Sequence, residues 1–414
     1  MFDPQGDLYG ATTDGGPATC KPIGGACGTV FQLSPPSEGG GSWTETLIYQ
    51  FQGKGSNDAS VPSGGLIRDS AGNLYGVTGY GGTGDCVLLG VTAGCGTVYE
   101  LSPPQQKGDA WTETILYSFP TAKQGYVPNG DLVFDSAGNL YGATSFGGGK
   151  GTTCDEFYGG QCGVVFELTP PELSPPKTKG GKWTEKVLHA FAGGTDGANP
   201  NGGLVFDNKG AVYGTTSFGG FEGGACSAGG CGIVFELKPT TKKRGAWAEE
   251  IVHRFKGAPD GGGPSAGLVF DTKGNLYGTT LGGGGVRSGS GTVFKLTHNA
   301  NGAWAERILY TFQFGDDGAE PRGGVVFDTR GNVYGTASAG GASGGWTVFE
   351  LRHRRAGVGR LLCSTPLRAT PMAPGRLADL IFDAASNLYG TTEQSGTGQA
   401  CGNYGCGTVF ELSP

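Results

Sequence analysis

The sequence predicts an all-β fold made of seven copies of one four-stranded unit. A Leu-Tyr-Gly or Val-Tyr-Gly motif occurs seven times, at Tyr9, Tyr75, Tyr141, Tyr213, Tyr277, Tyr334 and Tyr389. Successive tyrosines are 55 to 72 residues apart, so the unit accepts insertions while its internal order is kept. Four short strands in a repeat of this length are typical of a propeller blade. We therefore expect a seven-bladed β-propeller of four-stranded antiparallel blades.

Each unit contains four short apolar runs, as the unit beginning at Asn201 illustrates. The runs are residues 202–207, 211–216, 233–237 and 247–255, separated by Gly, Asn, Asp and Pro. This punctuation indicates strands, and no segment sustains the 3.6-residue period of a helix. By analogy with other propellers we name the strands a (innermost) to d (outermost). The b–c and d–a loops then share one face, and the a–b and c–d turns share the other.

The fourth run carries the clearest pattern. Alternate residues of the first copy are Trp43, Glu45, Leu47, Tyr49 and Phe51. The same stripe returns at Trp111, Trp183, Trp247 and Trp304. A period of two places these side chains on one sheet face. Burying each aromatic stabilises the fold by roughly 1.5–3 kcal/mol, so the stripes can hold blades together.

We expect one domain, residues 1–414, whose closure is imperfect. The units are approximately residues 1–51, 64–119, 130–191, 202–255, 267–312, 323–377 and 378–414. The first keeps only Phe2 and Asp3 of strand a, and the last has no strand d. Such unpaired edges can support edge-to-edge self-association. The alternatives are a fragment of a longer array and a β-helix, although β-helix coils need far fewer residues.

Residues 352–379 break the repeat where a Trp-bearing strand d should be. The segment holds six arginines and no acid before Asp379. A basic binding loop is one interpretation. We favour a decayed or frameshifted repeat, because the pattern resumes in phase at Leu380.

Composition excludes several classes of protein. The net charge is −7, from 29 Lys+Arg and 36 Asp+Glu, which argues against a nucleic-acid partner. No apolar run approaches the roughly 20 residues of a membrane helix. No signal peptide is visible, because Met1, Phe2 and Asp3 align with a repeat strand, and we expect that a leader lay upstream.

Ten of the eleven cysteines fall in pairs within b–c loops. The pairs are Cys20/Cys27, Cys86/Cys95, Cys154/Cys162, Cys226/Cys231 and Cys401/Cys406. Two cysteines without a histidine are too few for a zinc site, so we predict a disulfide in each loop. Each would stabilise the fold by roughly 2–3 kcal/mol. Disulfides indicate an oxidising compartment, and hence a secreted or surface protein. Cys363 is left over in the broken segment.

The motifs G-L-V-F-D-x-x-G-N-L-Y-G-T-T, G-T-V-F-E-L and W-x-E-x-V-L-Y-x-F resemble the bacterial GloVer tandem repeat, also described as choice-of-anchor repeat proteins. The resemblance covers nearly the whole chain. It implies an exported bacterial protein that often carries a separate surface anchor. It supplies no catalytic residues to transfer.

Residues that could perform chemistry mostly follow the repeat. His189 and His253 replace tyrosines of the strand d stripe, which favours packing, and neither His298 nor His353 has an evident partner. Asp69 and its counterparts end strand a, where an aspartate can bond the turn backbone. The carboxylates of the d–a loops could form a calcium site, but a turn role is favoured: Asp58, Asp196, Asp260 and Asp317. We therefore predict no catalytic residue, no metal and no cofactor.

Five aromatic residues break the repeat on the b–c face: Phe157, Tyr158, Phe221, Trp346 and Tyr404. Aromatics on a rigid platform suit sugar rings or protein partners, although they could instead cover their own loops. We predict a non-catalytic binding or surface module for a glycan or a protein. The alternatives are an extracellular polysaccharide hydrolase or lyase with carboxylates near the central channel, and a structural surface or filament protein. Non-repeated charged or tyrosine side chains around the inner strands would favour the enzyme.

Overall fold

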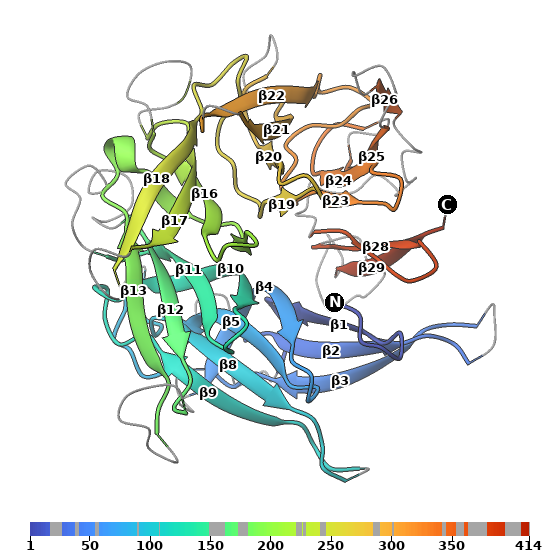
Figure 1. The fold of residues 1–414 in the computed structure, drawn as a ribbon. Coiled ribbons are helices and arrows are strands. Elements are labelled where there is room, and N and C mark those ends of the chain that lie inside the picture. The colour runs from blue at the N-terminus through green and yellow to red at the C-terminus, as the bar shows by residue number, and fades with distance from the viewer. Residues whose placement is uncertain are drawn as a thin grey trace.

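The chain forms seven antiparallel sheets arranged in a ring (Figure 1). The computed structural model describes residues 1–16, 27–37, 41–53, 58–88, 91–106, 108–148, 162–172, 181–220, 226, 229–240, 246–284, 290–299, 302–341, 345–352, 360–362, 379–393 and 407–413. Within each blade the strands follow one another from the ring axis outward, which confirms the predicted propeller and the order a to d.

Blade 1 contains β1 (Leu8–Thr12), β2 (Thr29–Ser34) and β3 (Thr44–Gln50). Blade 2 contains β4 (Ala59–Arg68), β5 (Leu74–Gly81), β8 (Thr97–Ser102) and β9 (Thr112–Ser118), with a small hairpin of β6 (Val87–Leu88) and β7 (Val91–Thr92) in its b–c loop. Blade 3 contains β10 (Tyr126–Phe134), β11 (Leu140–Phe146), β12 (Val164–Thr169) and β13 (Thr184–Ala190). Blade 4 contains β14 (Ala198–Pro200), β15 (Val205–Phe206), β16 (Val212–Phe218), β17 (Ile233–Pro239) and β18 (Trp247–Arg254).

Blade 5 contains β19 (Val269–Phe270), β20 (Leu276–Thr280), β21 (Thr292–His298) and β22 (Trp304–Thr311). Blade 6 contains β23 (Val326–Phe327), β24 (Val333–Ala337), β25 (Thr347–Arg352) and β26 (Arg360–Leu362). Blade 7 contains β27 (Ile381–Phe382), β28 (Leu388–Thr392) and β29 (Thr408–Leu412). The helical content of the described residues is one 3₁₀ turn, η3 (Gly194–Asp196).

Two features of the blades differ from the sequence expectation. Strand a of blades 2 and 3 begins several residues earlier than its apolar run, because the preceding Val-Pro segment also pairs with strand b after a shift in register. In blade 4 the same two segments form the separate strands β14 and β15, both paired with β16. Blade 6 gains a short outer strand from the basic segment, since β26 pairs with the end of β25.

The glycine of the Leu-Tyr-Gly motif lets an aromatic ring of strand c cross strand b. A Cβ on Gly142 would lie 2.6 Å from Cζ of Phe166 and 2.9 Å from Cδ2 of Leu132. Phe166 is completely buried. The six sister glycines face the ring of strand c in the same way: Gly10, Gly76, Gly214, Gly278, Gly335 and Gly390. The motif is therefore a packing requirement of every blade.

The aspartate that ends strand a organises the a–b turn, as predicted. Oδ1 of Asp69 accepts the backbone N–H groups of Ala71 and Asn73, both at 2.9 Å. Its Oδ2 accepts the Asn73 amide at 2.8 Å and the Tyr75 hydroxyl at 3.0 Å. The tyrosine of the motif is thus tied to the turn of its own blade.

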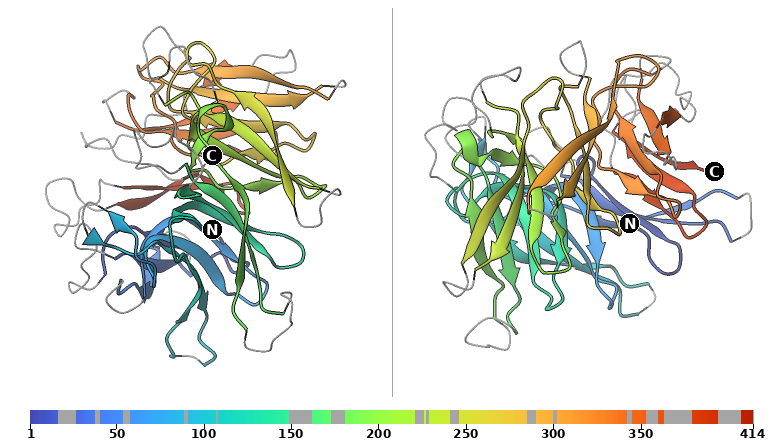
Figure 2. Two further views of the ribbon diagram at one scale, coloured as in Figure 1. Left: turned by 90° about the vertical axis from the view of Figure 1, so that its left-hand side faces the viewer. Right: turned by 45° about the horizontal axis from the view of Figure 1, so that its top comes forward.

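The hydrophobic core lies between neighbouring blades. The ring of Tyr75 packs edge-on against Phe134 of the next blade, with centroids 5.0 Å apart, and five more boundaries repeat this contact. One of these joins Tyr389 of blade 7 to Phe2, while Trp43 approaches the same tyrosine at 5.7 Å. Figure 2 shows the blue and red blades side by side. Blades 1 and 7 therefore contact each other through side chains, although each has three described strands.

Among the described helices, none is long and apolar enough to span a membrane.

Candidate functional site

The b–c and d–a loops lie on one face of the ring, because backbone hydrogen bonds join them across blade boundaries. The N–H of Val61, which begins a Val-Pro segment, donates to the carbonyl of Cys27 at 2.8 Å. Asn199 donates to Cys162 at 2.7 Å in the same way. We call this side of the ring the disulfide face.

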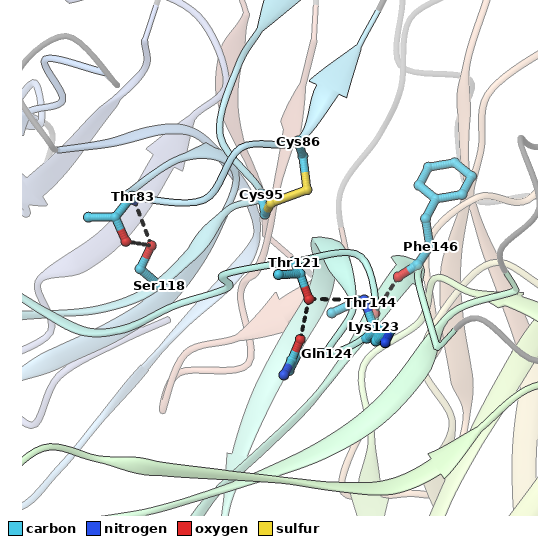
Figure 3. The surroundings of a disulfide bond; sticks show 9 residues. All are labelled: Thr83, Cys86, Cys95, Ser118, Thr121, Lys123, Gln124, Thr144 and Phe146. Atoms are coloured by element: carbon cyan, nitrogen blue, oxygen red, sulfur yellow. Dashed lines mark hydrogen bonds between the residues drawn. A yellow bond between two sulfur atoms is a disulfide. The ribbon is translucent and has the colours of Figure 1, made fainter.

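Two predicted disulfides are present in the described residues. Cys86 bonds to Cys95 with Cα atoms 5.0 Å apart, and Cys226 bonds to Cys231 at 5.4 Å. Figure 3 shows the first beside the Thr83–Ser118 hydrogen bond that ties the same loop to strand d. Cys27 and Cys162 are disulfide-bonded as well. The other predicted disulfide cysteines lie outside the described residues: Cys20, Cys154, Cys401 and Cys406.

Residues in or just before the a strands, the innermost strands of the blades, form a collar around the ring axis. One residue of each blade from 2 to 7 occupies the collar, directly before the Leu or Val that starts the apolar run: Gly65, Asp131, Gly203, Gly267, Gly324 and Asp379. These residues approach one another closely. A Cβ on Gly203 would lie 3.1 Å from the Cβ of Asp131, and a Cβ on Gly324 would lie 3.4 Å from the carboxylate of Asp379. Two aspartates thus stand where four blades have glycine.

Each collar aspartate bonds across a blade boundary. Asp131 accepts the N–H of Gly65 from blade 2, and Asp379 accepts the N–H of Gly324 from blade 6. The side chain of Asp379 is exposed to solvent, but many protein atoms surround it. Partial loss of solvation raises the pKa of Asp379, and the nearby negative charge of Asp131 acts in the same direction. The collar therefore holds two carboxylates, and the charge of Asp131 acts on Asp379.

Two residues before the collar, further polar side chains break the repeat on the disulfide face. The amide of Asn129 donates to Oδ1 of Asn201 at 3.2 Å, and the Ser145 hydroxyl donates to the same atom at 2.8 Å. In blade 6 this position is Arg322, which donates to Glu320 at 2.9 Å. Asn129, Asn201, Arg322, Asp131 and Asp379 together are named the axial polar group.

Of the five aromatic residues predicted to bind ligand, the structure describes Trp346. Its ring stacks on Phe410 of blade 7, with centroids 5.3 Å apart and planes inclined by 23°. The indole Nε1 is buried without a hydrogen-bond partner among the described atoms. Trp346 thus packs at the boundary of blades 6 and 7. Phe157, Tyr158, Phe221 and Tyr404 lie outside the described residues.

The glutamate of strand d enters the boundary with the preceding blade. The Tyr49 hydroxyl of blade 1 donates to Glu113 of blade 2 at 3.1 Å and approaches Asp58 at 3.3 Å. Burial raises the pKa of Glu113 to about 9, and the hydrogen bond and negative charge of Asp58 add to this shift. Asp58 also accepts the backbone N–H of Gln52 at 2.7 Å, which confirms its turn role.

Two histidines occupy the tyrosine position of this boundary motif. His189 and His253 pack edge-on against Phe191 and Phe255, with centroids 4.7 Å apart in both pairs, as the stripe predicted. They also face carboxylates of a d–a loop and of the next blade. Sequence reasoning did not find these partners, although Asp196 and Asp260 each follow their histidine by seven residues.

Comparison with known protein families gives one match. The sequence profile of the Gloeobacter/Verrucomicrobia repeat matches residues 86–349, well over half of the chain. A search of curated proteins found no match.

Two solved structures are similar in shape. A protein provisionally described as a gluconolactonase is 16% identical with a TM-score of 0.35, and the match covers 71% of this chain and 77% of that one. A proposed glucose dehydrogenase from Thermus thermophilus is 15% identical with a TM-score of 0.43, and the match covers 85% and 96%. Values this low say nothing about activity. The profile match shows that the chain belongs to the Gloeobacter/Verrucomicrobia repeat family.

Proposed function

We propose that this chain is an exported, non-catalytic binding module that holds a glycan on the disulfide face. The observation that carries the proposal is the axial polar group, five side chains that break the repeat at two neighbouring positions in or just before the inner strands. A feature present in every blade cannot define a single site. These residues differ from blade to blade and so can define one.

The chemistry of the axial polar group suits a sugar. Asn129 and Asn201 carry amide donors and carbonyl acceptors that already bond to each other and to Ser145. Arg322 carries donors only, and the aspartates carry acceptors. Sugar hydroxyls need both kinds of partner at fixed positions. Backbone packing in the collar keeps these groups on a rigid scaffold, as binding sites on loops require. The other aromatics predicted for this face would add stacking surfaces, whereas Trp346 packs on Phe410.

The disulfides support export. Bonds such as Cys86–Cys95 and Cys226–Cys231 are typical of an oxidising compartment, which for a bacterial protein means the periplasm, the cell surface or the medium. Surface attachment would then depend on a partner or on a segment other than the described blades.

A second candidate is an extracellular polysaccharide hydrolase or lyase, and the collar aspartates favour it. Asp131 and Asp379 are non-repeated carboxylates near the ring axis, the feature expected of the enzyme. The raised pKa of Asp379 is the property that a carboxyl acting as a general acid needs. Their backbone hydrogen bonds across blades favour a structural role instead.

A glycan array and polysaccharide pull-down with the purified protein tests the proposal. Arg322→Ala should weaken binding at least tenfold, whereas Arg330→Ala, an exposed arginine on the opposite a–b turn of the same blade, should leave it unchanged. Trp346→Ala tests whether the aromatic packing of blades 6 and 7 supports binding. Equal binding by both arginine variants would contradict the proposed site.

The same assay separates the alternatives. New reducing ends or unsaturated sugars that disappear in Asp379→Asn would establish the enzyme. A protein that binds no glycan and elutes as an oligomer in size-exclusion chromatography would support the structural alternative.

A further inference from the structure

At two successive blade boundaries a histidine, an aspartate and a glutamate converge. In the first, His189 of β13 and Asp196 of η3 belong to blade 3, and Glu249 of β18 comes from blade 4. The second repeats the arrangement one blade further on, with His253 of β18, Asp260 of the following loop and Glu306 of β22. The two clusters are related by the repeat, so they are two copies of one design.

The spacing of the atoms suits a small cation. Nε2 of His189 lies 3.3 Å from the Asp196 carboxylate and 3.7 Å from Oε2 of Glu249. Nε2 of His253 lies 3.5 Å from Oδ2 of Asp260 and 3.6 Å from Oε1 of Glu306. Ligands at about 2.0–2.1 Å from a tetrahedral zinc ion are about 3.3–3.5 Å apart. The observed separations nearly match that edge length.

Contacts with residues outside the two clusters hold these side chains in place. The edge-on packing of His189 on Phe191, and of His253 on Phe255, fixes both imidazole rings. The backbone N–H of Ala192 donates to Asp196 at 2.6 Å.

In the second cluster, two buried atoms lack a hydrogen-bond partner among the described residues. They are Nε2 of His253 and Oε1 of Glu306. Both atoms lie at ion-pair distance within the cluster but make no hydrogen bond to the described residues, so a ligand that both can bind would satisfy them.

The first boundary of the ring provides an internal comparison. There Tyr49 takes the histidine position, and its hydroxyl donates to Glu113 while approaching Asp58. A phenol donates one hydrogen bond to these carboxylates, leaves Oε1 of Glu113 without a partner among the described atoms, and is a poor metal ligand at neutral pH. Replacing it by imidazole supplies a nitrogen ligand beside two carboxylates, and keeps the aromatic packing.

We propose that each His–Asp–Glu cluster binds a divalent transition-metal ion of the zinc class, with a fourth position open to water. Imidazole together with carboxylates suits zinc, whereas calcium and magnesium prefer oxygen ligands alone. Two carboxylates also balance the charge of the ion. Because the glutamate comes from the next blade, each ion would join two blades.

Isothermal titration of the metal-free protein with zinc chloride, with metal analysis after dialysis, tests the proposal. Two ions per chain are expected. His189→Tyr and His253→Tyr should each bind one ion, and the double variant none. Tyrosine is the residue of the sister boundary, so these variants keep the packing, and an unchanged melting temperature without zinc would verify this.

The converse variant strengthens the test. Tyr49→His should create a third site with Asp58 and Glu113, raising the count to three. Zinc binding that survives in the double variant would show adventitious surface sites and overturn the proposal. Absence of binding at micromolar zinc would overturn it as well.

Discussion

Substitution of the motif glycine tests the packing that underlies the repeat. Gly142 lies in β11, where the side chains of Phe166 and Leu132 cross it. In Gly142→Ala the new Cβ would lie 2.6 Å from the Phe166 ring and 2.9 Å from Leu132. Both neighbours are buried, at 0% and 3% exposure, so they have little room to move.

The expected cost follows from these distances. Carbon atoms pack at about 3.5–4.0 Å, so the Phe166 ring would have to move by about 1 Å within a close-packed core. Overpacking of this kind typically costs about 1–3 kcal/mol. Alanine also restricts the unfolded chain, which returns about 0.4–1 kcal/mol where the backbone tolerates it. We therefore expect Gly142→Ala to lower the free energy of unfolding by about 1–2 kcal/mol.

Urea unfolding followed by tryptophan fluorescence measures the change, with Gly79→Ala as the control. Gly79 also lies in a b strand, but its Cβ would meet nothing closer than 3.6 Å. Phe166→Leu should make Gly142→Ala nearly neutral, because the smaller side chain leaves room. The reasoning is refuted if Gly142→Ala costs no more than Gly79→Ala, or if the double variant shows no coupling.

Three further predictions concern single contacts. Replacing Cys86 and Cys95 by alanine should lower the free energy of unfolding by about 2.7 kcal/mol, the chain-entropy value for a bridge of sequence separation 9. Non-reducing peptide mapping should first find the two cysteines bridged. Free thiols there would overturn the export argument. Between pH 4.5, the ordinary pKa of the glutamate, and about 9, its pKa in the fold, Glu113 is protonated in the folded chain and ionised in the unfolded chain. Its contribution to the free energy of unfolding therefore falls as pH rises through that window, by at most about 1.4 kcal/mol per pH unit. Glu113→Gln should therefore gain stability relative to the parent from pH 5 to pH 8 in urea titrations, and a constant difference would contradict the raised pKa. Asp69→Asn should lower the free energy of unfolding by about 1–3 kcal/mol in the same assay, because an amide NH₂ would replace an oxygen that accepts hydrogen bonds from Asn73 and Tyr75. A neutral result would show that the turn does not depend on the carboxylate.

The candidate site was predictable only in part. The disulfide at Cys86 and Cys95 followed from local spacing, because the two residues share one loop. Asp131 and Asp379 are visible as breaks when the a strands are aligned, yet only the ring brings residues about 250 positions apart into one collar. Trp346 broke the repeat as expected, but its stacking partner Phe410 belongs to another blade, which no local pattern indicates.

By itself the sequence determined the number of units, the four-strand pattern of each blade, the turn aspartates and the motif glycines. These features depend on the alternation of apolar and polar residues, on turn chemistry and on close packing within a single blade. Each copy of the repeat, about sixty residues long, shows them again. Only the tertiary structure decided what lies between blades. His189 meets Asp196 across a loop and Glu249 across a boundary, because ring closure sets the rotation from one blade to the next. That rotation comes from side-chain packing at every boundary at once, so no single repeat encodes it.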